Sequence, residues 1–176
     1  IRYFDTAPMY CGGHAERLVG HVACRRRGKM FIATKAGMLP PSTSLPARAA
    51  RRIAQAAGVS PPAFAVPPSR QFKPVQVAAS LQTSLRQLGK SRIDMLLLHE
   101  PKPQDITDDL LTLLQDRRDQ GDIGQFGLAT GRQATKDIMA RYPGVFSYAQ
   151  VPDAMGDRNE VAISRSAATI IGSHSL

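Results

Sequence analysis

A chain of 176 residues with 43% hydrophobic and 21% charged residues has the length and composition of one globular domain. No run approaches 18 apolar residues, and no basic N-terminal region precedes an apolar stretch, so we expect neither a membrane span nor a signal peptide. The net charge of +9 invites a nucleic-acid interpretation, but the basic clusters lack interleaved aromatic residues, so a phosphorylated small-molecule cofactor is the better partner for that charge.

Helix-like and strand-like segments alternate along the chain. Apolar residues spaced three and four apart predict helices, and short apolar runs predict strands. In chain order we expect strand Ile1–Phe4, helix His14–Arg27, strand Met30–Thr34, a short helix within 47–57, helix Pro74–Leu88, strand Ile93–Leu98, helix Asp105–Gln120, strand Gly124–Leu128, helix Arg132–Arg141, strand Val145–Gln150 and a short strand Ala168–Ile171. This order predicts a parallel sheet with helices packed outside it.

One segment, at about 37–73, interrupts the alternation and is rich in Pro, Ser and Ala. We interpret it as an insertion into a single domain spanning 1–176. It is either a disordered surface segment or a loop that overlies the strand ends and shapes a pocket. The first strand starts without a lead-in and the last lacks a closing helix, so we expect the chain to be part of a longer protein.

The two cysteines, Cys11 and Cys24, are too few for a disulfide framework and have no zinc-ligand spacing. We therefore expect no metal site. Their pairing is one alternative; reduced thiols in a cytoplasmic protein are the favoured one.

Four polar residues follow or end short apolar strands: Asp5, Tyr10, Lys35 and His99. In a parallel sheet the carboxyl ends of the strands lie at one edge or barrel mouth, so these side chains are expected to converge there. Taken singly, each has a simpler interpretation: a turn start, a surface aromatic, a snorkelling amine and a strand-end hydrogen bond, respectively. Taken together, they predict a proton-transfer site.

The chemistry of this set suits the reduction of a carbonyl group. A tyrosine is a poor proton donor at neutral pH, but a nearby ammonium favours its phenolate. A buried lysine in turn needs a carboxylate to stay charged, so Asp5, Lys35 and Tyr10 form a chain of acid, amine and phenol. His99 would orient or help protonate a carbonyl oxygen. No side chain supplies a hydride, which implies a nicotinamide cofactor.

These residues lie in motifs that resemble those of the aldo-keto reductases. The segment Phe4–Glu16, FDTAPMYCGGHAE, resembles the family signature FDTAxxYGxGxSE, and Ile32–Lys35 resembles the strand that carries the family's lysine. The segments Ser80–Leu88 and Ile93–Pro101 together resemble a third motif, with the histidine in place, and the likeness continues to Gln150. The resemblance implies an α/β fold of the (β/α)₈ TIM-barrel type, incomplete here, with about five to six of its eight βα units.

The resemblance also implies roles for individual residues. Tyr10 would be the proton donor, Lys35 and Asp5 its tuning pair, and His99 the group that orients the carbonyl. Gln150 would bind the nicotinamide carboxamide, with Asp5 near the ribose and Thr130 close to the family's Ser-Asn cofactor contact. Two departures stand out: Cys11 replaces a glycine, and the sequence around Thr130 is altered. The family's first strand and its phosphate-binding loop would lie outside 1–176.

The sequence therefore predicts an oxidoreductase that reduces an aldehyde or ketone with hydride from NADPH. The alternative is a non-catalytic reductase-like module that binds a nucleotide or a protein partner, or an inactive fragment. We expect a small-molecule carbonyl substrate and no nucleic-acid or membrane partner. The preference for NADPH over NADH comes from the resemblance alone, and the sequence carries no signal for the particular substrate or for the oligomeric state.

Overall fold

The computed structural model describes residues 2–25, 30–38, 45–59, 70–152 and 169–173. Six strands in this part form one parallel sheet whose order in space is the order in the chain. They are β1 (Tyr3–Asp5), β2 (Phe31–Ala36), β3 (Ile93–His99), β4 (Ile123–Ala129), β5 (Tyr148–Pro152) and β6 (Thr169–Ser173). Parallel neighbours in chain order, joined by helices, are the arrangement of a (β/α)₈ barrel, so the predicted fold class of an incomplete barrel is confirmed.

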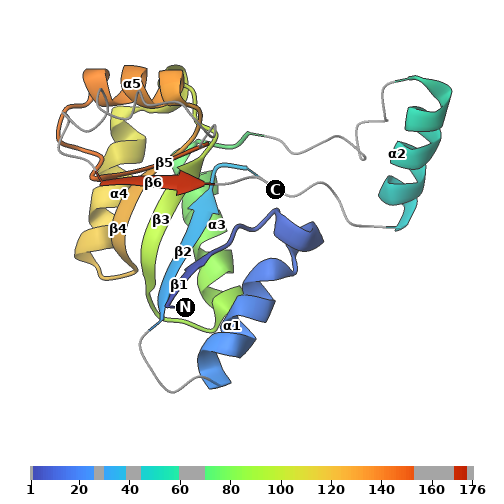
Figure 1. Ribbon diagram of the computed structural model, residues 1–176, viewed down its shortest axis with the longest axis horizontal. Helices are drawn as coiled ribbons and strands as arrows, with labels where there is room; N and C mark the ends of the chain where they lie inside the picture. The colour runs from blue at the N-terminus through green and yellow to red at the C-terminus, as the bar shows by residue number, and fades with distance from the viewer. Residues whose placement is uncertain (1, 26–29, 39–44, 60–69, 153–168, 174–176) are drawn as a thin grey trace.

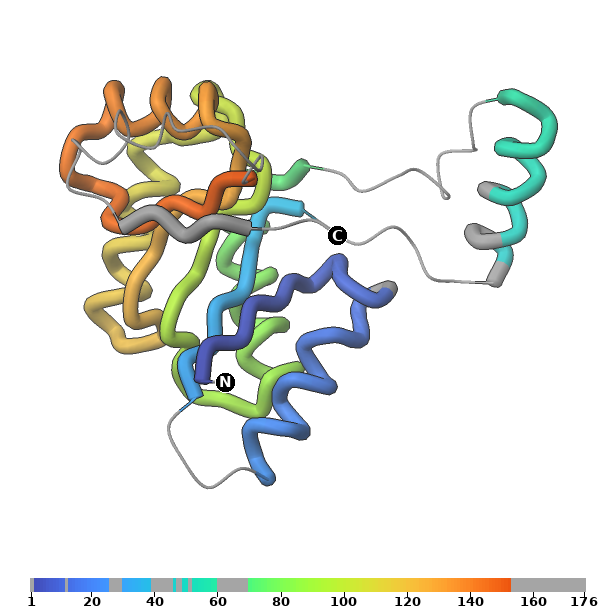
Figure 2. The backbone as a smooth tube through the Cα atoms, viewed as in Figure 1, coloured from blue at the N-terminus to red at the C-terminus, as the bar shows by residue number. Residues whose placement is uncertain are grey.

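The helices pack on the outside of the curved sheet, as Figure 1 shows. They are α1 (Ala15–Arg25), α3 (Pro74–Leu88), α4 (Asp108–Asp119) and α5 (Arg132–Arg141), with short 3₁₀ turns η1 (Tyr10–Gly13) and η3 (Pro103–Asp105). A further helix, α2 (Leu45–Ala57), stands apart from the sheet in Figures 1 and 2. The short helix expected within 47–57 therefore forms, while much of the insertion around it lies outside the described residues.

Local signals placed most element boundaries to within about two residues. Helix α3 begins at Pro74 and is followed by Gly89 in the left-handed conformation, at φ 62°, which favours glycine. Helix α4 begins later than predicted because the Thr107 hydroxyl accepts a hydrogen bond from the amide of Leu110 and caps the helix there. The predicted strand 145–150 is likewise shifted, to β5 at Tyr148–Pro152.

Alternating side chains divide the sheet into two packed faces. The face under the helices carries the large core, which includes Ile32, Leu96 and Leu128. The opposite face carries a smaller cluster of Ala33, Met95, Leu97 and Ala129, with Tyr3 and Tyr148 packed against it. Because side chains alternate along a strand, residues two positions beyond this smaller cluster share its face at the strand ends. The site described below lies there.

Helices α1 and α3 approach each other closely at Gly20. A Cβ atom on Gly20 would lie 2.6 Å from the carbonyl oxygen of Leu88, so only glycine permits this contact. The same packing leaves Leu18 and Val22 of α1 exposed, at 63% and 42%. In the part of the chain that the structure describes, no helix combines the length and the apolar character that crossing a bilayer requires.

Candidate active site

The carboxyl ends of the strands carry a small cavity of about 90 Å³. Three of the four predicted residues line it: Tyr10 from η1, Lys35 from β2 and His99 from the end of β3. The fourth, Asp5 at the end of β1, is hydrogen-bonded to Lys35. The structure thus brings all four side chains together from segments up to 94 positions apart in the sequence, Asp5 to His99.

Lys35 is the centre of the hydrogen-bond network. Its Nζ donates to both carboxylate oxygens of Asp5, each at 2.7 Å, and to the Tyr10 hydroxyl at 3.0 Å. A longer contact of 3.4 Å reaches the carbonyl oxygen of Thr6. Lys35 is only 2% exposed, and the carboxylate provides the opposite charge that a buried ammonium requires. Asp5 and Lys35 therefore fix the position of the tyrosine hydroxyl.

Tyr10 and His99 both line the cavity, and their side chains contact each other. Their rings pack edge to face, with centroids 6.0 Å apart and an interplanar angle of 90°. Tyr10 is 37% exposed, whereas the Nδ1 atom of His99 is buried and has no hydrogen-bond partner among the described residues. Burial, and then the positive charge of Lys35, lower the pKa of His99 to about 4, against the opposing effect of Asp5. His99 is thus a neutral imidazole at physiological pH.

The depressed pKa of His99 predicts a loss of stability in acid. The unfolded chain, with a histidine pKa of 6.5, binds more protons than the folded chain between pH 6.5 and about 4. The free energy of unfolding therefore falls as the pH drops through that window, and His99→Gln is expected to remove this part of the dependence. Urea unfolding at pH 7 and pH 4.5 measures it. His21→Gln, at an exposed histidine, is the control, and an unchanged slope in His99→Gln would contradict the prediction.

Gln150 and Thr130 also line the cavity. Gln150 donates from Nε2 to the Asp5 carboxylate at 3.1 Å, while its Oε1 atom is buried without a partner in the described part of the chain. The Thr130 hydroxyl donates to the carbonyl oxygen of Pro101 at 3.2 Å. The pairing of β4 with β5 brings them together, because the Thr130 amide donates to the Gln150 carbonyl at 3.2 Å.

The sequence did not identify several residues that lie near the cavity. Glu100, Ala129 and Pro152 line it, and Glu100 has a left-handed backbone with φ 54°. Tyr3 lies on the same face as Asp5, and burial, followed by the negative charge of Asp5, raises the pKa of Tyr3 to about 12. The period of two along a strand is a signal that would have identified Tyr3, since it lies two residues before Asp5.

The Cys11 substitution noted in the sequence lies at a strained backbone position. Cys11 adopts φ 51°, in the left-handed region, and directly follows Tyr10. Glycine adopts this conformation without the steric cost that a Cβ brings. Cys11→Gly removes a steric cost of about 1–2 kcal/mol and adds the larger conformational entropy that glycine loses on folding, which costs about 0.5–1 kcal/mol. A net stabilisation of about 0.5–1 kcal/mol is therefore expected. Thermal unfolding measures the change, with Cys24→Gly in α1 as a control that should destabilise it; a lower melting temperature for Cys11→Gly would refute the strain.

Neither cysteine pairs with the other: Cys11 and Cys24 are both free and exposed. Within the described ranges, no group of three or more His, Cys, Asp or Glu side chains is placed to hold a metal ion.

Comparison with known proteins shows which family this chain belongs to. The family model described as the aldo/keto reductase family matches residues 1–149. D-threo-aldose 1-dehydrogenase from a Pseudomonas species is 33% identical over 111 residues, covering 60% of this chain and 32% of the relative. Pyridoxal 4-dehydrogenase from Microbacterium luteolum is 32% identical over 106 residues, covering 57% of this chain and 30% of the relative.

Solved structures show the same fold at lower identity. An aldo-keto reductase from Bacillus halodurans, in its holo form, superposes with a TM-score of 0.73 at 20% identity, covering 98% of this chain and 52% of that one. One from Klebsiella pneumoniae in complex with NADPH gives 0.63 at 18% identity, with 98% and 52% covered. This chain thus spans about half the length of those structures and aligns with about a third of the curated relatives. Its match to the family model over 1–149 shows that the chain belongs to the aldo/keto reductase family.

Proposed function

We propose that the protein carrying this chain interconverts a carbonyl compound and its alcohol, with NADPH or NADP as the hydride carrier and Tyr10 as the proton donor. The observation that carries the proposal is the Lys35 ammonium, which contacts the Asp5 carboxylate and the Tyr10 hydroxyl at once beside a cavity that also contains His99. Residues 1–176 would then form part of one barrel domain, with an insertion at about 37–73.

The proton leaves from the Tyr10 hydroxyl. As a carbonyl oxygen in the cavity gains negative charge, Tyr10 donates its proton, and the phenolic oxygen becomes negative in turn. The Lys35 ammonium, 3.0 Å from that oxygen, stabilises the developing charge, and Asp5 keeps the ammonium in place. Because the His99 ring is neutral, one of its nitrogens carries a hydrogen that can be donated to the same carbonyl oxygen, which holds it near Tyr10. In the oxidative direction the phenolate accepts the alcohol proton.

The cavity has a polar group that fits a nicotinamide cofactor. The buried Oε1 atom of Gln150 is an acceptor without a partner in the described residues. The N–H group of a carboxamide is a donor that would satisfy it. Gln150 would therefore hold the carboxamide, with Asp5 close to it and Thr130 at the neighbouring strand end. When bound, the cofactor supplies or accepts the hydride, while the side chains of this chain donate or accept the proton.

The names of two relatives support a proposal for the substrate. One is named as a dehydrogenase of an aldose and the other as a dehydrogenase of pyridoxal, and both of these compounds carry an aldehyde and hydroxyl groups. A small, hydroxylated aldehyde or lactol is therefore the substrate class that we propose. A cavity lined by polar groups such as Tyr10, Lys35 and Gln150 suits such a molecule.

Nucleotide absorbance tests this function directly on the full-length gene product. We expect NADPH consumption with a simple aromatic aldehyde, and NADP reduction with an aldose or a pyridoxal-type aldehyde. Parallel assays with NADH and NAD settle the cofactor preference. No turnover in either direction, together with measurable nucleotide binding, would favour the non-catalytic module instead.

A further inference from the structure

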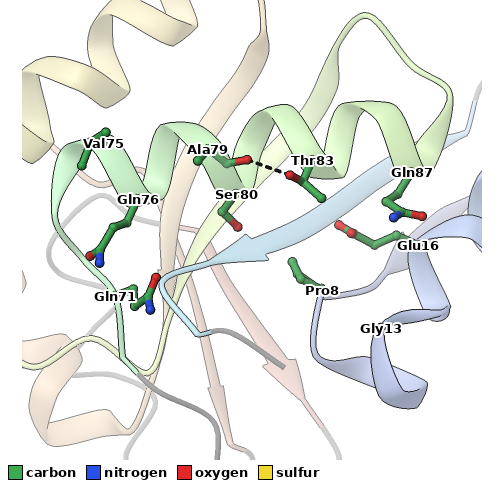
Figure 3. Close-up of a pocket in the computed structure, with 10 residues that line it drawn as sticks. All are labelled: Pro8, Gly13, Glu16, Gln71, Val75, Gln76, Ala79, Ser80, Thr83 and Gln87. Atoms are coloured by element: carbon green, nitrogen blue, oxygen red, sulfur yellow. Dashed lines mark hydrogen bonds between the residues drawn. The ribbon is translucent and has the colours of Figure 1, made fainter. Parts of the chain in front are cut away.

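A second and larger cavity lies outside the sheet, between α1 and α3. Its volume is about 520 Å³, within the range of roughly 300–1,000 Å³ common for ligand pockets. Figure 3 shows its walls: Pro8 and Gly13 on the side of η1, and α3 with Val75 and Ala79 on the other. It shares no lining residue with the cavity at the strand ends in the described part of the chain. The proton-transfer site therefore does not account for it.

A buried carboxyl group reaches into this cavity. Glu16 is 3% exposed, extends from α1 toward α3 in Figure 3, and lines the hollow. Its Oε1 atom accepts a hydrogen bond from the Thr34 hydroxyl at 2.6 Å. Burial raises the pKa of Glu16, and the hydroxyls of Thr34 and Ser84 act against that shift. No charged neighbour contributes to the shift, and none of the described lining residues is basic.

Glu16 thus differs from Asp5, the carboxylate of the strand-end site. Asp5 is paired with the Lys35 ammonium, whereas the groups that act on Glu16 are the neutral hydroxyls of Thr34 and Ser84. A carboxyl group buried without a counter-ion is costly to ionise, and a cation entering the cavity removes that cost. A ligand group that complements the Glu16 carboxylate is therefore positively charged.

A second acceptor lies on the opposite wall. The Oε1 atom of Gln87, on α3, is buried and has no hydrogen-bond partner among the described residues. Gln87 lines the same cavity as Glu16, so two acceptors from two helices face one space. An acceptor without a partner calls for a donor, and an alkylammonium group has three N–H donors and one positive charge.

We propose that the cavity between α1 and α3 binds a small primary amine, with its ammonium group between Glu16 and Gln87 and its apolar body against Pro8 and Ala79. This site is independent of the proposed reductase function. Pro8 and Gly13 belong to the segment that also holds Tyr10, so the bound amine contacts the same segment as the proposed proton donor.

Calorimetric titration of the full-length protein with cyclohexylamine, at pH 8 and without nucleotide, tests the site. We expect saturable binding of one equivalent. Glu16→Gln, which keeps the shape and an acceptor for Thr34, should weaken binding about tenfold or more, because it removes a charge-assisted hydrogen bond. Ala79→Leu, at an exposed position in the cavity wall, should weaken it similarly by filling the space. Cyclohexanol, which lacks the charge, should bind at least about tenfold more weakly than the amine.

Two controls keep the test decisive. Gln82→Leu adds an apolar side chain to an exposed position of α3 that does not line the cavity, and it should leave binding unchanged. Tyr10→Phe should also leave it unchanged; if it abolishes binding, the amine occupies the strand-end cavity and the proposal fails. Absence of saturable binding, or equal affinity in Ala79→Leu, overturns it as well. The Ala79→Leu result stands even if Glu16→Gln does not fold.

Discussion

Replacing Tyr10 with phenylalanine is expected to lower kcat for carbonyl reduction by about 10²–10⁴-fold, the usual contribution of a positioned general acid. The substitution removes only the hydroxyl that lies 3.0 Å from Lys35 Nζ and leaves the ring that packs edge to face against His99. Nucleotide and substrate affinity should therefore change much less than kcat. Steady-state kinetics with the full-length gene product, with KM and kcat resolved separately, measure the effect.

Tyr142→Phe is the matched control for that variant. The Tyr142 hydroxyl donates to the carbonyl oxygen of Ile106 at 2.9 Å and does not line the strand-end cavity. Its loss should cost about 1 kcal/mol of stability and leave kcat unchanged. If Tyr10→Phe retains native kcat, another group supplies the proton and the assignment of Tyr10 is wrong.

Lys35→Met is expected to lower kcat by about 10²–10³-fold, the scale for removing one charged stabiliser of a transition state. Methionine approximates the unbranched aliphatic part of the lysine side chain but leaves the phenolic oxygen without its cation and the Asp5 carboxylate without its ion pair. The free energy of unfolding should fall too, because the loss of one partner of a buried pair leaves the other uncompensated. The carboxylate keeps its hydrogen bond from Gln150.

The measurement for Lys35→Met combines kinetics with urea unfolding. Lys136→Met, at an exposed position on α5, controls for the loss of one positive charge and should behave like the native protein in both assays. Native kcat in a folded Lys35→Met variant would show that the ammonium does not act on Tyr10. A folded variant without activity, by contrast, separates the chemical role of Lys35 from its structural one.

The boundaries of α3 and α5 could be predicted from sequence because their signals are local. Pro74 and Gly89 mark the ends of α3, and the apolar residues between them repeat at helical spacing. The late start of α4 was not predicted, because Thr107 competes with Asp105 and only the backbone conformation shows which residue caps the helix. The exposure of Leu18 and Val22 was not predicted either, because the close contact at Gly20 determines which face of α1 packs against α3.

The strand pattern of the sequence is sufficient to predict the sheet of parallel strands and the residues at its carboxyl edge. Strand period and order along the chain are enough to place Asp5, Lys35 and His99 at neighbouring strand ends. The folded structure alone shows how those groups are connected: Gln150 donates a hydrogen bond to Asp5 across 145 positions, and burial makes His99 neutral. It also revealed the cavity with Glu16. The desolvation and hydrogen bonding of a side chain depend on all the groups packed around it, and that environment forms only when the chain folds.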